Sequence, residues 1–523
     1  MTRPQMQLQA EPEQLLAELR ELAREVDAQA DCIYRRWRPH VRRRAFIAGA
    51  WNFAAYLALR QHDLRSLQTR LMPLGVSSLG RCEGRVRQNL AAVIGALAAL
   101  CGEPPVRRPG AARAFFRGER ALRAEVERVF GPHRHHRTVR IMVTLPSEAA
   151  EDEDFVVALV SAGMDAARIN CAHDDAGMWQ AMVKNVRAAE NALGRRCSVY
   201  ADLPGPKVRT DRVHVRHDAR LRTGDAIALV RRLSDAKRSE AAMTCTIPAI
   251  LDRLRAGDPM WIDDGSVGCV VERVQPDRVD LRITQASERG VHLRSDKGLN
   301  FPSTAIPAPA LGSADHAALA ALVDRIDILG FSFVREPADI AELQAELGRL
   351  GRPDLPLALK IETNEGLANL PALIVQAAGR QPTAVMIARG DLAVEIGYRR
   401  LAEMQEELLW LCEAAATPVI WATQVLDEFV KTGIPTRAEI TDAAFAERAE
   451  CVMLNKGPHV VRAVEVLDEL IPLMEAHQTK KTSRMRALHS WPALTPRDAS
   501  VTIVERGASG STATAGAPGS PGP

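Results

Sequence analysis

Eight short apolar runs between residues 140 and 457 constrain the fold of this 523-residue chain more than any other feature. Most of them are separated from the next by one helix-length segment. The runs are RIMVTL (140–145), DAARIN (165–170), CSVYADL (197–203), DRIDILGFSF (324–333), LALKIE (357–362), AVMIARGDL (384–392), PVIWATQ (418–424) and CVMLNKG (451–457). Alternating strands and helices predict a parallel sheet, and eight such units predict a closed (β/α)8 TIM barrel. The expected fold class is therefore α/β.

The alternation of strands and helices breaks between residues 210 and 302, after the third predicted strand. Short strands and turns follow one another there without helices, as in MWIDDGSVGCVVERV (260–274). This pattern predicts a small β-barrel-like domain inserted into the TIM barrel. The barrel itself would then consist of residues 138–209 and 303–480.

The two ends of the chain differ from the barrel in composition and periodicity. Residues 1–135 show helical spacing of apolar residues and predict an all-α N-terminal region of unknown role. One apolar stripe there consists of Leu15, Leu19, Leu22 and Val26. Residues 481–523 begin with a basic stretch and end in a tail of Gly, Ser, Pro and Ala, for which we expect disorder.

Groups capable of chemistry follow six of the eight predicted strands. In a (β/α)8 barrel the reacting groups lie at the C-terminal ends of the strands. The residues at these ends are Arg168, Asn170, Asp202, Ser332, Arg335, Lys360, Glu362, Gly390, Asp391, Thr423 and Gln424. Two carboxylates from neighbouring strands suit Mg2+ or Mn2+, and arginine and lysine beside such a metal suit a phosphate. Each residue alone could form a rim salt bridge, but together they predict metal-assisted phosphoryl transfer or enolate chemistry.

Nine motifs follow one another in order across about residues 138–475. They are DAARINCAHDD, ADLPGPKVRT, IDDGSVG, SDKGLNFPS, GFSFVRE, LALKIETNEGL, VMIARGDLAVEIG, VIWATQVLDEFVKTGIPTRAEITD and CVMLNKG. This series resembles the pyruvate kinase family, most diagnostically around Lys360 and Asp391. The resemblance implies the same barrel and Mg2+-dependent phosphoryl transfer from phosphoenolpyruvate to ADP, which yields pyruvate and ATP.

The resemblance also implies roles for single residues. Glu362 and Asp391 would hold the divalent metal, and Lys360, Arg168 and Thr423 would be catalytic. Lys360 and Arg168 would contact the phosphate, and Thr423 would help protonate the enolate. The substrate would contact these three side chains and the turn at Gly390 and Asp391, where helix-start amides favour a carboxylate. The implied nucleotide-binding residues are Asn170, Arg209, Asp264 and Lys297, the last two from the inserted domain acting as a lid.

The region that holds a monovalent cation in many family members departs from the usual pattern. Asn170 and Asp202 are present, but Ala172 and Leu203 replace an oxygen-bearing Ser and Thr. The combination of Leu203 and Lys207 matches the cation-independent branch of the family. We therefore expect activity without K+, with the ammonium of Lys207 supplying the missing positive charge.

Two further departures leave other functions open. The stretch NKGP at 455–458 replaces the family's usual Ser-Gly-Glu-Thr, and only about 65 residues follow the eighth predicted strand. We therefore expect no C-terminal effector domain, and the N-terminal helices could serve assembly in its place. The alternatives are a barrel enzyme that uses phosphoenolpyruvate or another enolate with a different acceptor, and a non-catalytic scaffold.

Composition limits the partners. The net charge is only +3, although YRRWRPHVRRR (34–44) holds six arginines. That cluster suits a solvated face or subunit contact, whereas nucleic acid is a less favoured partner and a homo-oligomer is compatible. The chain has no run of about 18 apolar residues, so we expect no membrane span. Nine scattered cysteines without a CxxC pair favour reduced thiols and a cytoplasmic location.

Overall fold

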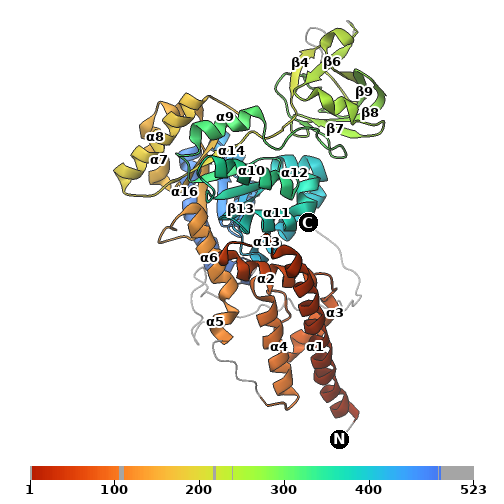
Figure 1. Cartoon of the computed structure of the whole chain (residues 1–523), viewed down its shortest axis with the longest axis vertical. Coiled ribbons are helices and arrows are strands. Elements are labelled where there is room, and N and C mark those ends of the chain that lie inside the picture. Colours follow the sequence, from red (N-terminus) through yellow and green to blue (C-terminus); the bar gives the residue numbers. More distant parts are fainter. Residues whose placement is uncertain (1–2, 105–110, 216–219, 238–239, 481, 484–523) are drawn as a thin grey trace, which may run out of the picture. The chain divides into compact units, whose positions relative to one another are not determined.

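The computed structural model describes residues 3–104, 111–215, 220–237, 240–480 and 482–483 (Figure 1). The elements described below belong to one structural unit, Met1–Ser483. The C-terminal tail for which disorder is expected lies outside the described residues.

The N-terminal region is helical, as its periodicity predicts. Its helices are α1 (Arg3–Trp37), α2 (Arg44–Leu59), α3 (Arg65–Leu71), α4 (Val86–Leu100), α5 (Ala111–Phe115) and α6 (Arg117–Phe130). Short 3-10 turns lie at Met72–Leu74 and Glu83–Arg85. The predicted stripe on α1, from Leu15 to Val26, is at most 7% exposed, because α1 packs along α2 and α4.

Eight parallel strands close a barrel in the order β1-β15-β14-β13-β12-β11-β3-β2. They are β1 (Arg140–Thr144), β2 (Ala166–Asn170), β3 (Ser198–Asp202), β11 (Ile328–Phe331), β12 (Leu357–Ile361), β13 (Thr383–Ala388), β14 (Val419–Ala422) and β15 (Cys451–Leu454). Each falls within one of the eight predicted runs or overlaps it, so the predicted TIM barrel is confirmed. Because all strands run the same way, their C-terminal ends form one rim. Asn170 of β2, for example, pairs with Asp202 of β3 there.

Helices follow the strands and cover the barrel. They are α7 (Glu153–Ala162), α8 (Ala176–Leu193), α9 (Ser313–Leu322), α10 (Pro337–Arg349), α11 (Asn364–Ala378), α12 (Arg389–Ile396), α13 (Tyr398–Ala414), α14 (Asp427–Thr432), α15 (Arg437–Ala446) and α16 (Val460–His477). A 3-10 turn, Ser147–Ala150, precedes α7, and β16 (Gln478–Thr479) and β17 (Thr482–Ser483) form a small hairpin after α16. Side-chain caps start several helices: the Asp175 carboxylate accepts from two amides of α8, and the Thr363 hydroxyl accepts from Gly366 in α11. Across the described parts of the chain, no helix is long and apolar enough to cross a membrane.

Helix α6 fills the N-terminal end of the barrel. Its apolar side chains Leu122, Val126, Val129 and Phe130 share a buried cluster with inward-facing residues of all eight strands. At the same end, the backbone amide of Thr383, the first residue of β13, donates to the Glu125 carboxylate. The N-terminal region is therefore packed into the barrel through α6.

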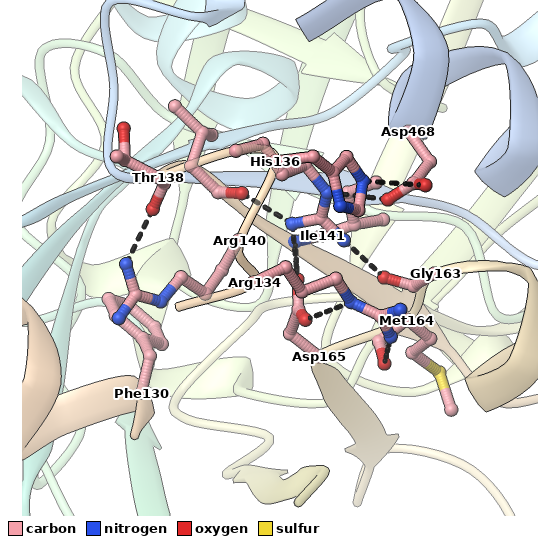
Figure 2. Close-up of polar contacts among 12 residues, drawn as sticks. Phe130, Arg134, His136, Thr138, Arg140, Ile141, Gly163, Met164, Asp165 and Asp468 are labelled. Atoms are coloured by element: carbon pink, nitrogen blue, oxygen red, sulfur yellow. Dashed lines mark hydrogen bonds and ion pairs between the residues drawn. The ribbon is translucent and has the colours of Figure 1, made fainter. Parts of the chain in front are cut away.

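The connection from α6 to β1 is held by a cluster of charges at that end (Figure 2). Arg137, whose side chain is fully buried, lies 2.6 Å from Asp165 and 2.6 Å from Asp468 of α16. Arg134 lies 2.9 Å from the other oxygen of Asp165. The sequence PHRHHR at 132–137 reads as a simple linker, but its two arginines anchor it to the barrel. The partners of these arginines lie about 30 and 330 residues away in the chain, so the local pattern could not reveal them.

The inserted domain is a seven-stranded sheet with its own apolar core. Its strands are β4 (Thr210–His214), β5 (Ala226–Val230), β6 (Ala241–Cys245), β7 (Pro259–Ile262), β8 (Val267–Gln275), β9 (Arg278–Gln285) and β10 (Leu299–Asn300), in the order β10-β7-β8-β9-β5-β6-β4. A bridge between Arg209 and Gly298 joins the two edge strands, with backbone hydrogen bonds of 2.8 Å on either side. The sheet therefore curls on itself, in agreement with the predicted β-barrel-like insertion after the third strand.

Candidate active site

A buried carboxylate, Asp202, lies at the centre of the C-terminal rim of the barrel. It ends β3 and accepts hydrogen bonds from side chains of β2, its neighbour, and of β12, which lies beyond β11. Arg168 of β2 donates to Asp202 Oδ2 from Nε at 2.8 Å and from Nη2 at 2.5 Å, and Lys360 of β12 donates from Nζ at 3.1 Å. Burial alone would raise the pKa of Asp202, but the two cations lower it below its ordinary value. Asp202 is therefore an anion that holds both cations in place.

Lys360 and Glu362 lie side by side, as their spacing of two residues predicts. Lys360 Nζ is 3.3 Å from Glu362 Oε1 and donates to Ser332 Oγ at 2.7 Å. The lysine is only 8% exposed. Burial would lower its pKa, but the charges of Asp202 and Glu362 outweigh burial and raise it. The ammonium therefore stays protonated in the interior at neutral pH.

Glu362 and Asp391 form the candidate metal site. Burial raises the pKa of Glu362, and the charge of Asp391 raises it further, against the opposing effect of Lys360. One oxygen of Glu362 accepts from the Phe333 amide at 2.6 Å, while the other lies 3.3 Å from Lys360 Nζ. Mg2+ prefers hard oxygen ligands and usually takes one or two carboxylates together with water and substrate phosphate. The carboxylates of Glu362 and Asp391 supply hard oxygen ligands of this kind.

Asp391, in the first turn of α12, already has two partners from outside its own helix. Lys207 Nζ donates to its two oxygens at 2.8 and 3.1 Å, and Asn300 donates to Oδ1 at 3.2 Å. The sequence groups Lys207 with Asn170 and Asp202, but the structure places its ammonium at Asp391 and 3.5 Å from Asp264. The direction of a long lysine side chain depends on the loop that carries it, and spacing alone does not give that direction.

Two residues near Asp391 contact one another in the structure, although the sequence analysis gives neither of them a role. Asn300 lies inside the motif SDKGLNFPS and ends β10, where the inserted domain rejoins the barrel. Glu395 lies one turn after Asp391 in α12. Burial raises its pKa to about 7, against a hydrogen bond from Asn300 that lowers it. The sequence could have pointed to Asn300 and Glu395, because each lies in one of the nine motifs, near a residue for which a role is expected.

Thr423 and Gly390 face each other across the ends of β14 and β13. Thr423 has a left-handed φ of 72°, and Arg389 donates to its carbonyl at 2.6 Å. Arg389 also pairs with Asp442 at 2.6 Å, which fixes the turn from β13 into α12. A Cβ on Gly390 would lie 2.9 Å from Thr423 Cγ2. Only glycine permits this close approach, so the first turn of α12 and Thr423 lie against one another as expected.

The residues expected to bind the nucleotide are less closely connected to one another than the charged residues of the rim. Arg209, just before the first strand of the inserted domain, pairs with Asp296 at 3.5 Å, and Lys297 pairs with Asp263 at 2.9 Å within that domain. Asp264 reaches the barrel rim only through Lys207. Asn170 accepts from the Ala172 amide at 3.2 Å beside Asp202 in the sheet. The described contacts thus unite Arg168, Asp202, Lys360, Glu362, Asp391 and Lys207, and leave Arg209 and Lys297 outside that network.

Comparison with known proteins points in one direction. A family model described as "Pyruvate kinase, barrel domain" matches residues 136–458. The pyruvate kinase of Mycobacterium intracellulare is 32% identical over 347 residues, covering 65% of this chain and 71% of that protein. That of Mycobacterium tuberculosis (strain ATCC 25618 / H37Rv) is 34% identical over 349 residues, with the same coverages. That of Bacillus licheniformis is 29% identical over 341 residues, covering 64% of this chain and 56% of that protein.

Proposed function

Because the chain belongs to the pyruvate kinase family, we propose that it transfers the phosphoryl group of phosphoenolpyruvate to ADP, forming pyruvate and ATP. The observation that carries this proposal is the linked set of buried charges at the rim, from Arg168 through Asp202 to Lys360 and Glu362. Phosphoryl transfer needs little covalent help from the protein and depends on positioning and electrostatic stabilisation. A fixed set of buried cations supplies both.

Arg168 and Lys360 would bind the phosphoryl group during its transfer. Both side chains are held by one oxygen of Asp202, so their separation is set before substrate arrives. Because the protein has already ordered these charges, they cost little reorganisation when charge develops on the phosphoryl oxygens. The raised pKa of Lys360 keeps it cationic for this role.

Glu362 and Asp391 would hold Mg2+, or Mn2+ in its place. When bound, the ion would polarise the phosphoryl oxygens and offset their charge. Lys207 and Asn300 now share the oxygens of Asp391, so they would have to yield part of this contact. Their donors would then be free to face the substrate.

Gly390, Asp391 and Thr423 would bind the pyruvate portion. The backbone amides in the first turn of α12 would accept the substrate carboxylate, since helix starts favour anions. Thr423, fixed beside Gly390, would help deliver the proton that converts the enolate to pyruvate. Asn170, Arg209, Asp264 and Lys297 would face ADP, with the inserted domain acting as a lid.

We further propose that the enzyme works without K+. Ala172 and Leu203 lack side-chain oxygens that could bind the ion. Lys207 supports this proposal because its ammonium already adds a fixed positive charge beside Asp391. We also propose a cytoplasmic location, in keeping with nine free cysteines.

Pyruvate formation from phosphoenolpyruvate and ADP with Mg2+ tests the proposal. We expect equal turnover with K+ and with tetramethylammonium as the only monovalent cation. The variant Lys360→Met should lose at least about a hundredfold in turnover, the scale of losing one electrostatic stabiliser. Lys431→Met is the matched control, because this lysine is 61% exposed on α14 and pairs with Asp427 of the same helix.

Three other outcomes would contradict parts of this proposal. Turnover that requires K+ would retain the phosphotransferase and refute the role of Lys207. Full activity in Lys360→Met would refute the mechanism. No turnover by the unaltered chain would favour another acceptor or a non-catalytic scaffold.

A further inference from the structure

One arginine, Arg389, joins the start of α12 to the end of β14 and to α15. Its Nε donates to the Ala422 carbonyl at 2.9 Å, and its Nη2 donates to the Thr423 carbonyl at 2.6 Å. Nη1 and Nη2 also donate to the two oxygens of Asp442 in α15, at 2.6 and 2.8 Å. The Arg389 side chain is 13% exposed. All three guanidinium nitrogens therefore have partners on other elements.

An aromatic ring fixes the same guanidinium from one face. The central carbon of the Arg389 guanidinium lies 4.6 Å from the centre of the Trp421 ring. Trp421 is fully buried in β14, and its ring centre lies 5.2 Å from that of Phe445 in α15. A ring beneath the cation and a two-pronged pair with a carboxylate both restrict how the guanidinium can turn. Arg389 is therefore held in one orientation.

The two carbonyls that Arg389 binds belong to consecutive residues, where the chain leaves strand geometry. In an extended strand, successive carbonyl groups point to opposite sides, so one guanidinium cannot reach both. Ala422 is the last residue of β14, and it pairs with Ala388, which directly precedes Arg389. The next residues have left-handed φ values of 72° at Thr423 and 59° at Gln424. A positive φ is rare for a β-branched residue and persists only where the surrounding structure holds it.

We propose that Arg389 is a positioning residue for protonation of the enolate, through the backbone conformation that it imposes on Thr423. This inference rests on the proposed function, in which Thr423 helps deliver the proton. In that step the C=C electron pair takes up a proton at the methylene carbon, and the enolate oxygen becomes the ketone oxygen of pyruvate. The threonine hydroxyl then regains its proton from solvent. Release of the two carbonyls would let Thr423 return to a negative φ and swing its hydroxyl away from the turn at Gly390.

The residues expected to act in phosphoryl transfer are held by different contacts. Arg168 and Lys360 both donate to Asp202, at the rim formed by β2, β3 and β12. The contacts of Arg389 run instead to β14 and α15. Loss of these contacts should therefore slow protonation more than phosphoryl transfer.

The two steps can be measured separately in the variant Arg389→Lys. Lysine keeps a positive charge beside Asp442 but lacks the planar fork that serves several acceptors at once. Phosphoryl transfer is measured as ATP formed from phosphoenolpyruvate and ADP with Mg2+. Protonation is measured in reverse by NMR, as deuterium uptake into the methyl group of pyruvate in D2O with Mg2+ and ATP. We expect deuterium uptake to fall at least about tenfold, because a well-placed acid or base contributes about a hundredfold or more. ATP formation should stay within about threefold.

Arg352→Lys is the matched control. Arg352 also donates to two backbone carbonyls, those of Val323 at 2.6 Å and Ile326 at 3.4 Å, but all three residues lie before the starts of β11 and β12. The ratio of the two rates should therefore stay at the value of the unaltered chain. A second variant, Asp442→Asn, weakens the hold on the Arg389 guanidinium from α15 and should also lower deuterium uptake more than ATP formation. It decides the question if Arg389→Lys does not fold.

Equal loss of both rates in Arg389→Lys, unchanged deuterium uptake, or the same change of ratio in Arg352→Lys would overturn the role of Arg389. An unaltered chain that forms ATP without deuterium uptake would also overturn it, and would leave the proposed phosphoryl transfer intact. A chain with deuterium uptake that depends on Arg389 but without ATP formation would uphold the role of Arg389 and refute the proposed function.

Discussion

The substitution Asp202→Asn removes the charge that holds Arg168 and Lys360 together without changing the side chain's size. Asp202 is 1% exposed and is within 3.1 Å of donors on both Arg168 and Lys360. Removing one partner from a buried ion pair typically costs about 3–5 kcal/mol, because the remaining charge stays buried without compensation. We expect a loss of this order in the free energy of unfolding at pH 7, measured with urea. The loss should shrink in acid, because the two cations hold the pKa of Asp202 below its ordinary value against the effect of burial.

The same variant should also change how activity depends on pH. Burial lowers the pKa of Lys360, and in the unaltered chain the charges of Asp202 and Glu362 outweigh it. Without the Asp202 charge, the pKa of Lys360 must fall. The ammonium would then lose its proton at a lower pH, so the alkaline decline in kcat should move toward neutrality. The measurement is kcat from pH 6 to pH 10 for both proteins, over the range where both stay folded.

Asp468→Asn is the control for this experiment. Asp468 also bonds a buried arginine, Arg137 at 2.6 Å, as part of the charge cluster of Figure 2, before the start of β1 rather than at the rim. The Asp468→Asn substitution should lower the free energy of unfolding and leave the decline of kcat at alkaline pH unchanged. If Asp202→Asn shifted neither stability nor the pH profile, or if Asp468→Asn shifted the profile equally, Asp202 would not be the residue that sets the charge of Lys360.

Three further perturbations test other parts of the structure. Burial raises the pKa of Glu447 to about 7, so above that pH the folded state must hold a buried carboxylate whose ionisation costs more than in the unfolded chain. Glu447→Gln should therefore raise the free energy of unfolding by about 1–3 kcal/mol at pH 8 and by little at pH 5, with urea titration as the readout. Lys207→Met should tighten Mn2+ binding severalfold in electron paramagnetic resonance titrations, because the ammonium now competes for Asp391; weaker binding would contradict this. Gly330→Ala should destabilise the barrel by about 1–3 kcal/mol, since the new Cβ would lie 2.1 Å from Tyr200 Oη, and an unchanged urea midpoint would contradict it.

Much of the fold follows from local sequence patterns. A buried parallel strand needs only a short apolar run, and all eight runs of this kind became barrel strands. The pair Lys360 and Glu362 was predictable for the same reason, because strand geometry places residues two apart on one face. The closeness of Arg168 to Asp202 also follows, since β2 and β3 are adjacent and in parallel register.

Contacts that depend on loops or on distant partners were not predictable from the sequence. Lys207 lies in the segment leading from β3 to the inserted domain, and that segment sends its ammonium to Asp391. Asn300 reaches the same carboxylate from the far end of the insertion, about 90 residues away. Periodicity predicted a helical region over residues 1–135 but could not indicate that the apolar face of α6 packs inside the barrel.

The position of α6 makes the N-terminal region part of the catalytic scaffold. The helix contacts the interior side chains of the barrel at one end, and the same strands carry the candidate catalytic residues at the other. Its residue Glu125 binds the first amide of β13, the strand that leads to Gly390 and Asp391. Protein interiors are close-packed, so a shift of α6 would be transmitted along the strands rather than absorbed in empty space. The packing of α6 and the contact of Glu125 therefore couple the N-terminal region to the strands that carry the candidate site.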